Sequence, residues 1–413
     1  MALLFLCLIF GTGRTQKIEA AVQNVPESLE EESRLDTVGT DQETERAAVR
    51  EKKGQQEKEA GDTETDQAAA AQDELLAELD FDAIQQEVDS LLSSQQFSFA
   101  GTVRSLLQDG DPFRTFRAGN AVLSCAKTAF LAQKGLMKEL FLLVLAGAVL
   151  GSFSSLFEGK QVRDASFYMV YLLALALILK NFQSSGENLK AVITSLVAFM
   201  RILTPSYYLA AAAAGGASSA VMFYQMLLLV ILAVEKLLLA LVLPMIHIYL
   251  LIALVNDLSG EEILSHMTEL LETCVNGLLK SSLGVLVGMQ MIRNLIAPAL
   301  DSLRQMALWR TAGMIPGIGN AVNAVTELVA GSAVLIRNCF GVTAMLVLLA
   351  AGMVPAVQLL VSGLSFRLLA AAAQPVSDKR IAGCLAAAGK GYAMLLRLLL
   401  TVEVLFLLTI AIL

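Results

Sequence analysis

The most informative hydrophobic pattern is an apolar run of fifty residues, 206–255, in which the only charged residues are the neighbours Glu235 and Lys236. A helix rises about 1.5 Å per residue and a bilayer core is roughly 30 Å thick, so this run suits two crossings. Charges cost least at the headgroups, which predicts a helical hairpin with its turn at this pair. The pattern indicates an integral membrane protein.

The rest of the C-terminal part alternates apolar segments with short charged connections, and this predicts an all-α fold with about seven to eight transmembrane helices. The segment 191–203 contains Arg201 and ends at Thr204 and Pro205, which favours a re-entrant or interfacial helix. The further predicted spans are 140–157, 165–179, 275–292, 312–336, 339–361 and 392–413.

The N-terminal part has a different pattern. Residues 1–20 begin with the apolar MALLFLCLIF and are interpreted as a signal peptide. Residues 21–72 form an acidic, low-complexity arm with too little apolar surface to fold. Residues 73–135 are predicted to be an amphipathic helical region. In 73–92 apolar residues recur at helical spacing, which predicts an amphipathic helix that docks on the chain's own membrane domain, 136–413, or binds a partner. We expect this N-terminal region to be extracytoplasmic.

The distribution of Lys and Arg predicts an orientation, because basic connections tend to stay in the cytoplasm. The interval 237–279 contains no Lys or Arg and includes the acidic segment 256–272, which is predicted to lie outside. The basic connections 293–310 and 367–390 are predicted to be cytoplasmic. This arrangement corresponds to eight crossings.

Composition supports the membrane class and narrows the chemistry. Hydrophobic residues make up 56% of the 413 residues and charged residues only 16%, against about 25% in soluble proteins. The net charge of -8 is concentrated in residues 19–78, which hold 18 acidic and 6 basic residues. Five scattered cysteines, two histidines and the absence of a nucleotide-binding P-loop motif give no enzyme signature. We therefore expect no catalysis, cofactor, metal or nucleic-acid partner, and a lipid bilayer as the surroundings.

Ionisable residues inside predicted spans are candidates for function. Each could instead form a structural pair or extend its charge to the membrane surface, and both interpretations stay open. Arg397 and Glu403 are six residues apart on one predicted helix and should not pair directly. His247 is predicted to be a core histidine. The candidates are Lys280, Glu327, Arg397 and Glu403.

Two glycine-containing segments add candidates of another kind. Pro316, Gly317, Gly319 and Asn320 can break a helix around a cavity, or form a surface loop before a helix begins. The small-residue stretch 209–220, with Gly215 and Gly216 at its centre, allows close helix packing and is predicted to lie in the middle of the bundle.

The order of these features resembles the stage III sporulation protein AE family of endospore-forming bacteria, over about 73–413. The features that support this resemblance are the apolar leader, the charged arm, the short spans, Thr204 with Pro205, the Ala/Gly-rich stretch, the turn 315–320 followed by Glu327, and Gly341 before a span with Pro355.

The resemblance implies a multi-pass protein of the mother-cell membrane around the engulfed forespore, within a secretion-like channel needed for forespore development. It implies as partners a secretion-type ATPase and ring-forming membrane proteins of the same operon, and the forespore-side stage II sporulation protein Q. An alternative from a different class is a secondary transporter whose substrate site lies at the helix break of Pro316 to Gly319.

Overall fold

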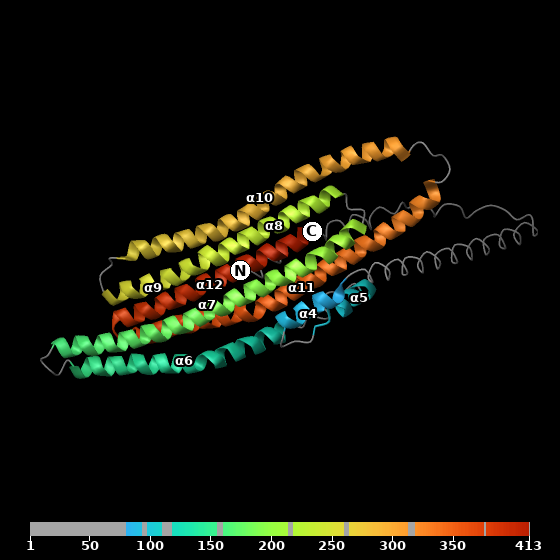
Figure 1. The fold of residues 1–413 in the computed structure, drawn as a ribbon. Helices are drawn as coiled ribbons and strands as arrows, with labels where there is room; N and C mark the ends of the chain where they lie inside the picture. The colour runs from blue at the N-terminus through green and yellow to red at the C-terminus, as the bar shows by residue number, and fades with distance from the viewer. Residues whose placement is uncertain are drawn as a thin grey trace, which may run out of the picture. The chain divides into compact units, whose positions relative to one another are not determined.

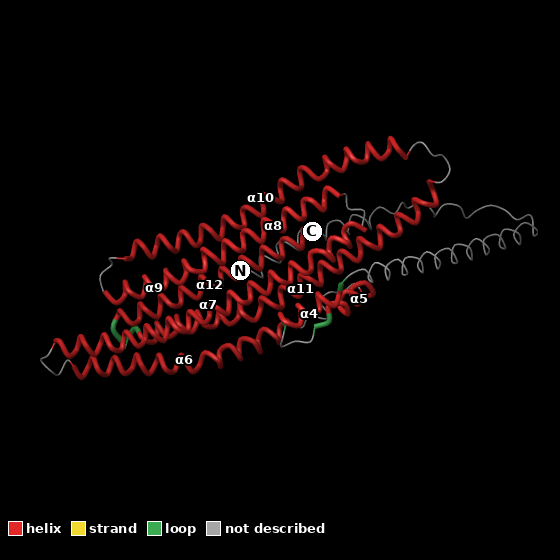
Figure 2. Tube along the Cα trace, in the orientation of Figure 1, coloured by secondary structure: helices red, strands yellow, loops and turns green. Residues whose placement is uncertain are grey.

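The computed structural model describes residues 80–92, 97–109, 118–154, 160–213, 218–259, 264–312, 319–375 and 377–412. The predicted signal peptide and acidic arm lie outside these residues. Within them every regular element is helical, as Figure 2 shows, and the all-α prediction is confirmed for this part of the chain.

The described helices follow one another along the chain and pack lengthwise in a bundle (Figure 1). They are α4 (Phe81–Leu91), α5 (Phe99–Asp109), α6 (Ala118–Ser154), α7 (Lys160–Ala213), α8 (Ser218–Leu237), the π-helical turn η1 (Leu238–Val242), α9 (Leu243–Ser259), α10 (Ser265–Ala312), α11 (Gly319–Ala373) and α12 (Lys379–Ile412).

Five helical segments among the described residues are long and apolar enough to cross a membrane. They are Tyr168–Tyr207, Leu228–Ser259, Ser265–Ile292, Gly331–Ala373 and Lys379–Ala411. The membrane-helix character of the chain is thereby supported. The predicted number of seven to eight spans is not confirmed, since several predicted segments belong to one continuous helix.

The predicted turn at Glu235 and Lys236 is wrong. The chain continues as a helix from α8 through η1 into α9, without a reversal. Glu235 is only 5% exposed, so packing against protein, and not a position at the headgroups, accommodates this residue. The π-helical turn ends two residues before Pro244, whose ring would clash with the carbonyl of Ala240 in a regular helix. The wider turn therefore lets the helix continue past proline.

The predicted end of a helix at Thr204 and Pro205 is also wrong. α7 joins the predicted segments 165–179 and 191–203 and continues through Pro205 to Ala213. The hydroxyl of Thr204 donates a hydrogen bond to the carbonyl of Met200 in the preceding turn, a pattern that membrane helices tolerate. The same continuity joins most of 312–336 with 339–361 in α11, which passes through Pro355.

The predicted orientation of two loops is wrong for a related reason. Because α11 is one helix and not two spans, 256–272 and 367–390 are separated by two long helices, α10 and α11, and return to the same end of the bundle. The contacts confirm this: Arg380 Nη1 donates to the carbonyl of Leu258 at 3.5 Å, and the Asp257 carboxylate lies against Gly383. The acidic and basic segments cannot lie on opposite sides of a membrane.

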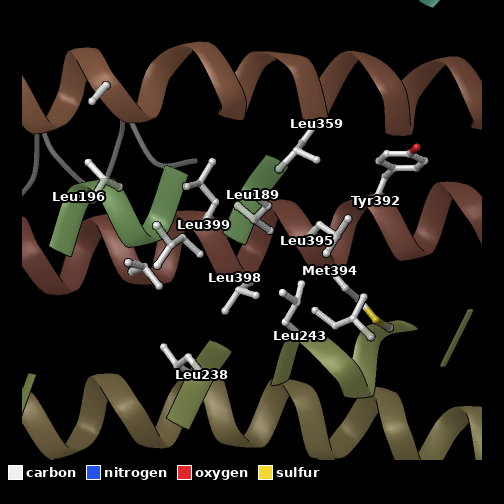
Figure 3. Close-up of a cluster of buried hydrophobic side chains, with 14 of the residues drawn as sticks. Leu189, Leu196, Leu238, Leu243, Leu359, Tyr392, Met394, Leu395, Leu398 and Leu399 are labelled. Atoms are coloured by element: carbon white, nitrogen blue, oxygen red, sulfur yellow. The ribbon is translucent and has the colours of Figure 1, made fainter. Parts of the chain in front are cut away.

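The core is organised around α12, which contacts α7, α8, α9, α10 and α11. Most large side chains of α12 are buried. Figure 3 shows part of this core, where leucines from several helices meet around α12: Leu189, Leu196, Leu238, Leu243, Leu359, Leu395, Leu398 and Leu399.

The amphipathic helix α4 docks on this bundle, as one of the two interpretations of 73–92 predicted. Asp80 caps its N-terminus by accepting from the backbone of Ala83 at 3.1 Å. Ile84 and Val88 are fully buried on one face. Phe81 of α4 and Phe99 of α5 pack edge-on or tilted against Phe340 of α11, which fixes the pair of helices to the membrane domain.

Candidate functional site

A group of polar and aromatic side chains, the central cluster, lies in the middle of the bundle and consists of Asn181, Phe182, Ser185, His247 and Tyr392. The Tyr392 hydroxyl of α12 accepts from Asn181 Nδ2 of α7 at 2.7 Å and lies 3.3 Å from the Ser185 hydroxyl. The Phe182 ring stands edge-on to both His247, at 5.3 Å, and Tyr392, at 5.2 Å. α7 and α12 thus share a partly buried polar contact, and α9 joins the cluster through the ring of His247.

Glycines make room for the central cluster. A Cβ atom at Gly186 would lie 2.6 Å from the imidazole of His247, and one at Gly391 would lie 3.0 Å from the Phe182 ring. A Cβ at Gly363 of α11 would lie 3.2 Å from Tyr392 Cβ. Close approach of helix backbones in a membrane bundle typically uses such small residues. The packing of α7, α9, α11 and α12 at this level therefore depends on glycine.

His247 was predicted to be a core histidine, and its ring is partly buried with one nitrogen hydrogen-bonded within its own helix. Its Nδ1 lies 2.9 Å from the carbonyl of Leu243, one turn earlier in α9, and the ring is partly buried against Gly186. The sequence did not predict the contacts of this ring with Phe182 and Gly186 of α7. The signal that could have found them is the polar stretch 180–190 in the middle of an apolar helix.

The structure separates the predicted ionisable candidates into two places. Arg397 is exposed and its Nη1 donates to Asn276 Oδ1 of α10 at 3.0 Å. Lys280 is exposed one turn further along α10, so these two cations lie near each other. Glu403 instead is only 7% exposed and faces α11. The prediction that Arg397 and Glu403 do not pair is confirmed.

Glu403 lies in a recess that a glycine creates. A Cβ atom at Gly352 would be 2.5 to 2.7 Å from the carboxylate atoms of Glu403, closer than real side chains come. Among the described residues, none forms a hydrogen bond or an ion pair with this carboxyl group. The absence of a side chain at Gly352 therefore provides the space that the buried Glu403 side chain occupies.

Glu235 was predicted only as part of a turn, but it is buried and is therefore a second intramembrane carboxyl group. Arg201 of α7 is close enough to interact electrostatically with Glu235. A buried acid on α8 thereby faces a cation whose side chain is exposed.

The remaining predicted candidates are not tested. Pro316 and Gly317 lie outside the described residues, as do Gly215 and Gly216. Gly319, Asn320 and Glu327 belong to the first turns of α11, where Gly319 is the first helical residue, but their side chains are outside the described part. Helix breaking around a cavity and close packing at these positions stay predictions.

The described residues contain no group of three or more His, Cys, Asp or Glu side chains that could hold a metal ion. The chemistry that the described part offers is a buried polar contact, two buried carboxyl groups and exposed cations.

Comparison with known families decides what the chain is. The family model described as stage III sporulation protein AE matches residues 97–413, which is most of the chain. The chain belongs to this family. Within the stage III sporulation protein AE family, a relative from Bacillus subtilis (strain 168), the stage III sporulation protein AE, is 22% identical over 283 residues. The alignment covers 68% of this chain and 71% of the relative. No solved structure matches.

Membership of the stage III sporulation protein AE family gives the chain a role in sporulation. The matched residues include α5 to α12, and therefore the central cluster and both buried carboxyl groups. The family description names a sporulation protein and no enzymatic activity.

Proposed function

We propose that this chain is a core membrane subunit of a secretion-like channel apparatus that links the mother cell with the forespore and supports forespore development after engulfment. The observation on which the proposal depends is the match to the stage III sporulation protein AE family over residues 97–413, which include the whole described membrane bundle. A polytopic bundle is the part of such an apparatus that has to cross the bilayer.

Several properties of the chain suit this role. The sequence lacks a nucleotide-binding P-loop motif, so an ATPase partner would supply energy. α6 and α10 expose large apolar side chains along their outer faces, among them Phe141, Leu145 and Leu295. Such faces contact lipid or the membrane segments of partners. The proposed partners are ring-forming membrane proteins of the same operon, the secretion-type ATPase and the forespore-side stage II sporulation protein Q.

The test is isolation of the assembly from sporulating cells. A tagged chain replaces the native copy, the cells are cross-linked after engulfment, and proteins that copurify from the mother-cell membrane are quantified by mass spectrometry. We expect enrichment of the operon proteins over a tagged, unrelated multi-pass protein of equal abundance. A deletion strain should make few heat-resistant spores, and the tagged chain should restore them.

Two outcomes would refute the proposal. One is copurification of none of the operon proteins although the tagged chain is abundant in the membrane. The other is a normal yield of heat-resistant spores from the deletion strain.

A further inference from the structure

The exposed side of α7 changes its character along the helix. Near its start the exposed side chains are large and apolar, for example Met169, which is 77% exposed, and Leu172. Beyond Leu173 the described part of α7 exposes no large hydrophobic side chain. It exposes instead a line of polar and small residues, here called the α7 stripe: Lys180, Ser184, Glu187, Ala191, Thr194 and Arg201.

The α7 stripe lies on one face of the helix. Its members follow one another at intervals of three, four or seven residues, which is the spacing of one helical face. The opposite face is buried in the bundle and includes Phe182, Leu189, Ile193 and Leu196. From Lys180 to Arg201 the helix rises about 32 Å, close to the thickness of the bilayer core.

At the same level the neighbouring helices expose apolar side chains. Gly186 touches His247 of α9, and the next residue, Ile248, is 48% exposed. Ser185 meets Tyr392, which packs on Gly363 of α11, and the next residue, Leu364, is 55% exposed. These side chains suit lipid. The exposed face of α7 is therefore polar at a level where α9 and α11 expose apolar side chains.

Two exposed cations on other helices, Arg367 and Arg397, do not extend the α7 stripe. Arg367 of α11 stands between exposed Leu364 and Leu368. Arg397 of α12 is held by Asn276, as described above.

Contact of the α7 stripe with lipid would be unfavourable in free energy. A Lys, Arg or Asp in the centre of a membrane helix costs roughly 2.5 to 3.5 kcal/mol even on the most permissive scale. The stripe combines two cations and one carboxylate with small hydroxyl residues, all exposed, and only at its Arg201 end does it adjoin a buried acid, Glu235 of α8. Charges of both signs and small side chains are typical of a surface in contact with water, and charged side chains are unfavourable against lipid.

We propose that the α7 stripe forms one wall of an aqueous path across the membrane. This inference rests on the proposed function, because it assigns the path of the apparatus to the outer face of α7 and not to the interior of a single bundle. The interior at this level is filled by the central cluster and its glycines.

The test compares the reactivity of single cysteines in sporulating cells. The starting variant has its five native cysteines replaced and must still support sporulation. Ser184→Cys, Ala191→Cys and Thr194→Cys place a thiol on the α7 stripe. Ile248→Cys and Leu364→Cys serve as controls at the same level on α9 and α11. Each variant is treated with a small, permanently charged methanethiosulfonate, and the labelled fraction is measured against time.

We expect the three stripe cysteines to react at least about ten times faster than the two control cysteines. Equal, slow reaction at all five positions would overturn the inference, since the stripe would then be closed to water. Equal, fast reaction at all five would overturn it as well, because this level of the bundle would lie outside the membrane.

Two further variants separate this inference from the proposed function. Ser184→Leu and Thr194→Leu fill the path while the buried face of α7 is unchanged, so membrane abundance and copurified partners should stay normal and spore yield should drop at least about tenfold. Normal copurification with unreactive stripe cysteines would refute the α7 stripe alone. Reactive stripe cysteines without any copurified operon protein would refute the proposed apparatus and leave the wetted face in place.

Discussion

α12 and α7 are both long membrane helices interrupted by polar residues, yet they place those residues in opposite surroundings. α12 is enclosed by five other helical segments and holds Glu403 in a recess beside Gly352. α7 packs one face into the core and exposes Lys180, Glu187 and Arg201 on the other. The difference shows that an ionisable residue in a span is explained by its neighbours: a glycine opposite it permits burial, and on an uncovered face its charge needs water or a partner.

The largest loss of stability is expected from a substitution at Gly352, beside the buried Glu403. In the middle of a helix Gly→Ala usually stabilises by up to about 1 kcal/mol. Gly352→Ala should instead destabilise by about 3 kcal/mol, because the methyl group would displace the Glu403 carboxyl group, which is buried and has little room to move. The measurement is the free energy of unfolding of the purified protein in mixed micelles, together with its abundance in the membrane.

Gly331→Ala on the same helix is the matched control, since nothing lies within 4 Å of a Cβ atom there. The double variant Gly352→Ala with Glu403→Ala should regain most of the lost stability, because it removes the atoms that collide. Equal effects of Gly331→Ala and Gly352→Ala would show that the recess is not a close contact.

Gly186→Ala, on the buried side of α7, should lower the free energy of unfolding by a smaller amount, about 2 kcal/mol. Its Cβ would lie 2.6 Å from the His247 ring, but this ring is only partly buried and can shift. His247→Ala should therefore rescue Gly186→Ala, and unfolding in mixed micelles measures both. Gly284→Ala on α10 is the control without neighbours. Additive losses in the double variant would contradict the contact.

The smallest of the three effects concerns the polar contact between α7 and α12. Tyr392→Phe removes the hydroxyl that accepts from Asn181, and leaves the amide without that partner at a cost of about 1 kcal/mol. The variant retains the aromatic ring at position 392, so the stacking with the ring of Phe366 is preserved. Adding Asn181→Leu should cost little more, which a double-mutant cycle measures. A coupling energy near zero would mean that water replaces the Asn181 contact.

The sequence predicted the helical membrane class and the sporulation family because both depend on patterns that extend over hundreds of residues. It failed where one local rule competed with tertiary packing. Glu235 and Lys236 suggested a turn, and Pro205 suggested a helix end, because charge and proline are costly for an isolated helix. In the bundle, Glu235 is enclosed by protein and both helices continue.

The candidate site was predictable only in part. Glu403 and Arg397 could be selected from sequence, since an ionisable residue in an apolar run is visible there. The contacts of Tyr392 with Asn181 and of Glu403 with Gly352 join residues that are distant in the sequence. A single sequence contains no signal for such pairs. The α7 stripe has the spacing of one helical face, but only the structure shows that this face is uncovered.

The continuity of α7 has a mechanical consequence. Its 54 residues rise about 81 Å, so the helix is more than twice as long as the bilayer core is thick. Hydrogen bonds run along this whole length, and proline removes one of them only near the C-terminal end, at Pro205. A rod of this kind transmits a push or a rotation from Lys160 as far as Pro205 without a break in its hydrogen bonds. A protein pressing on the Lys160 end would therefore displace the helix over this whole length.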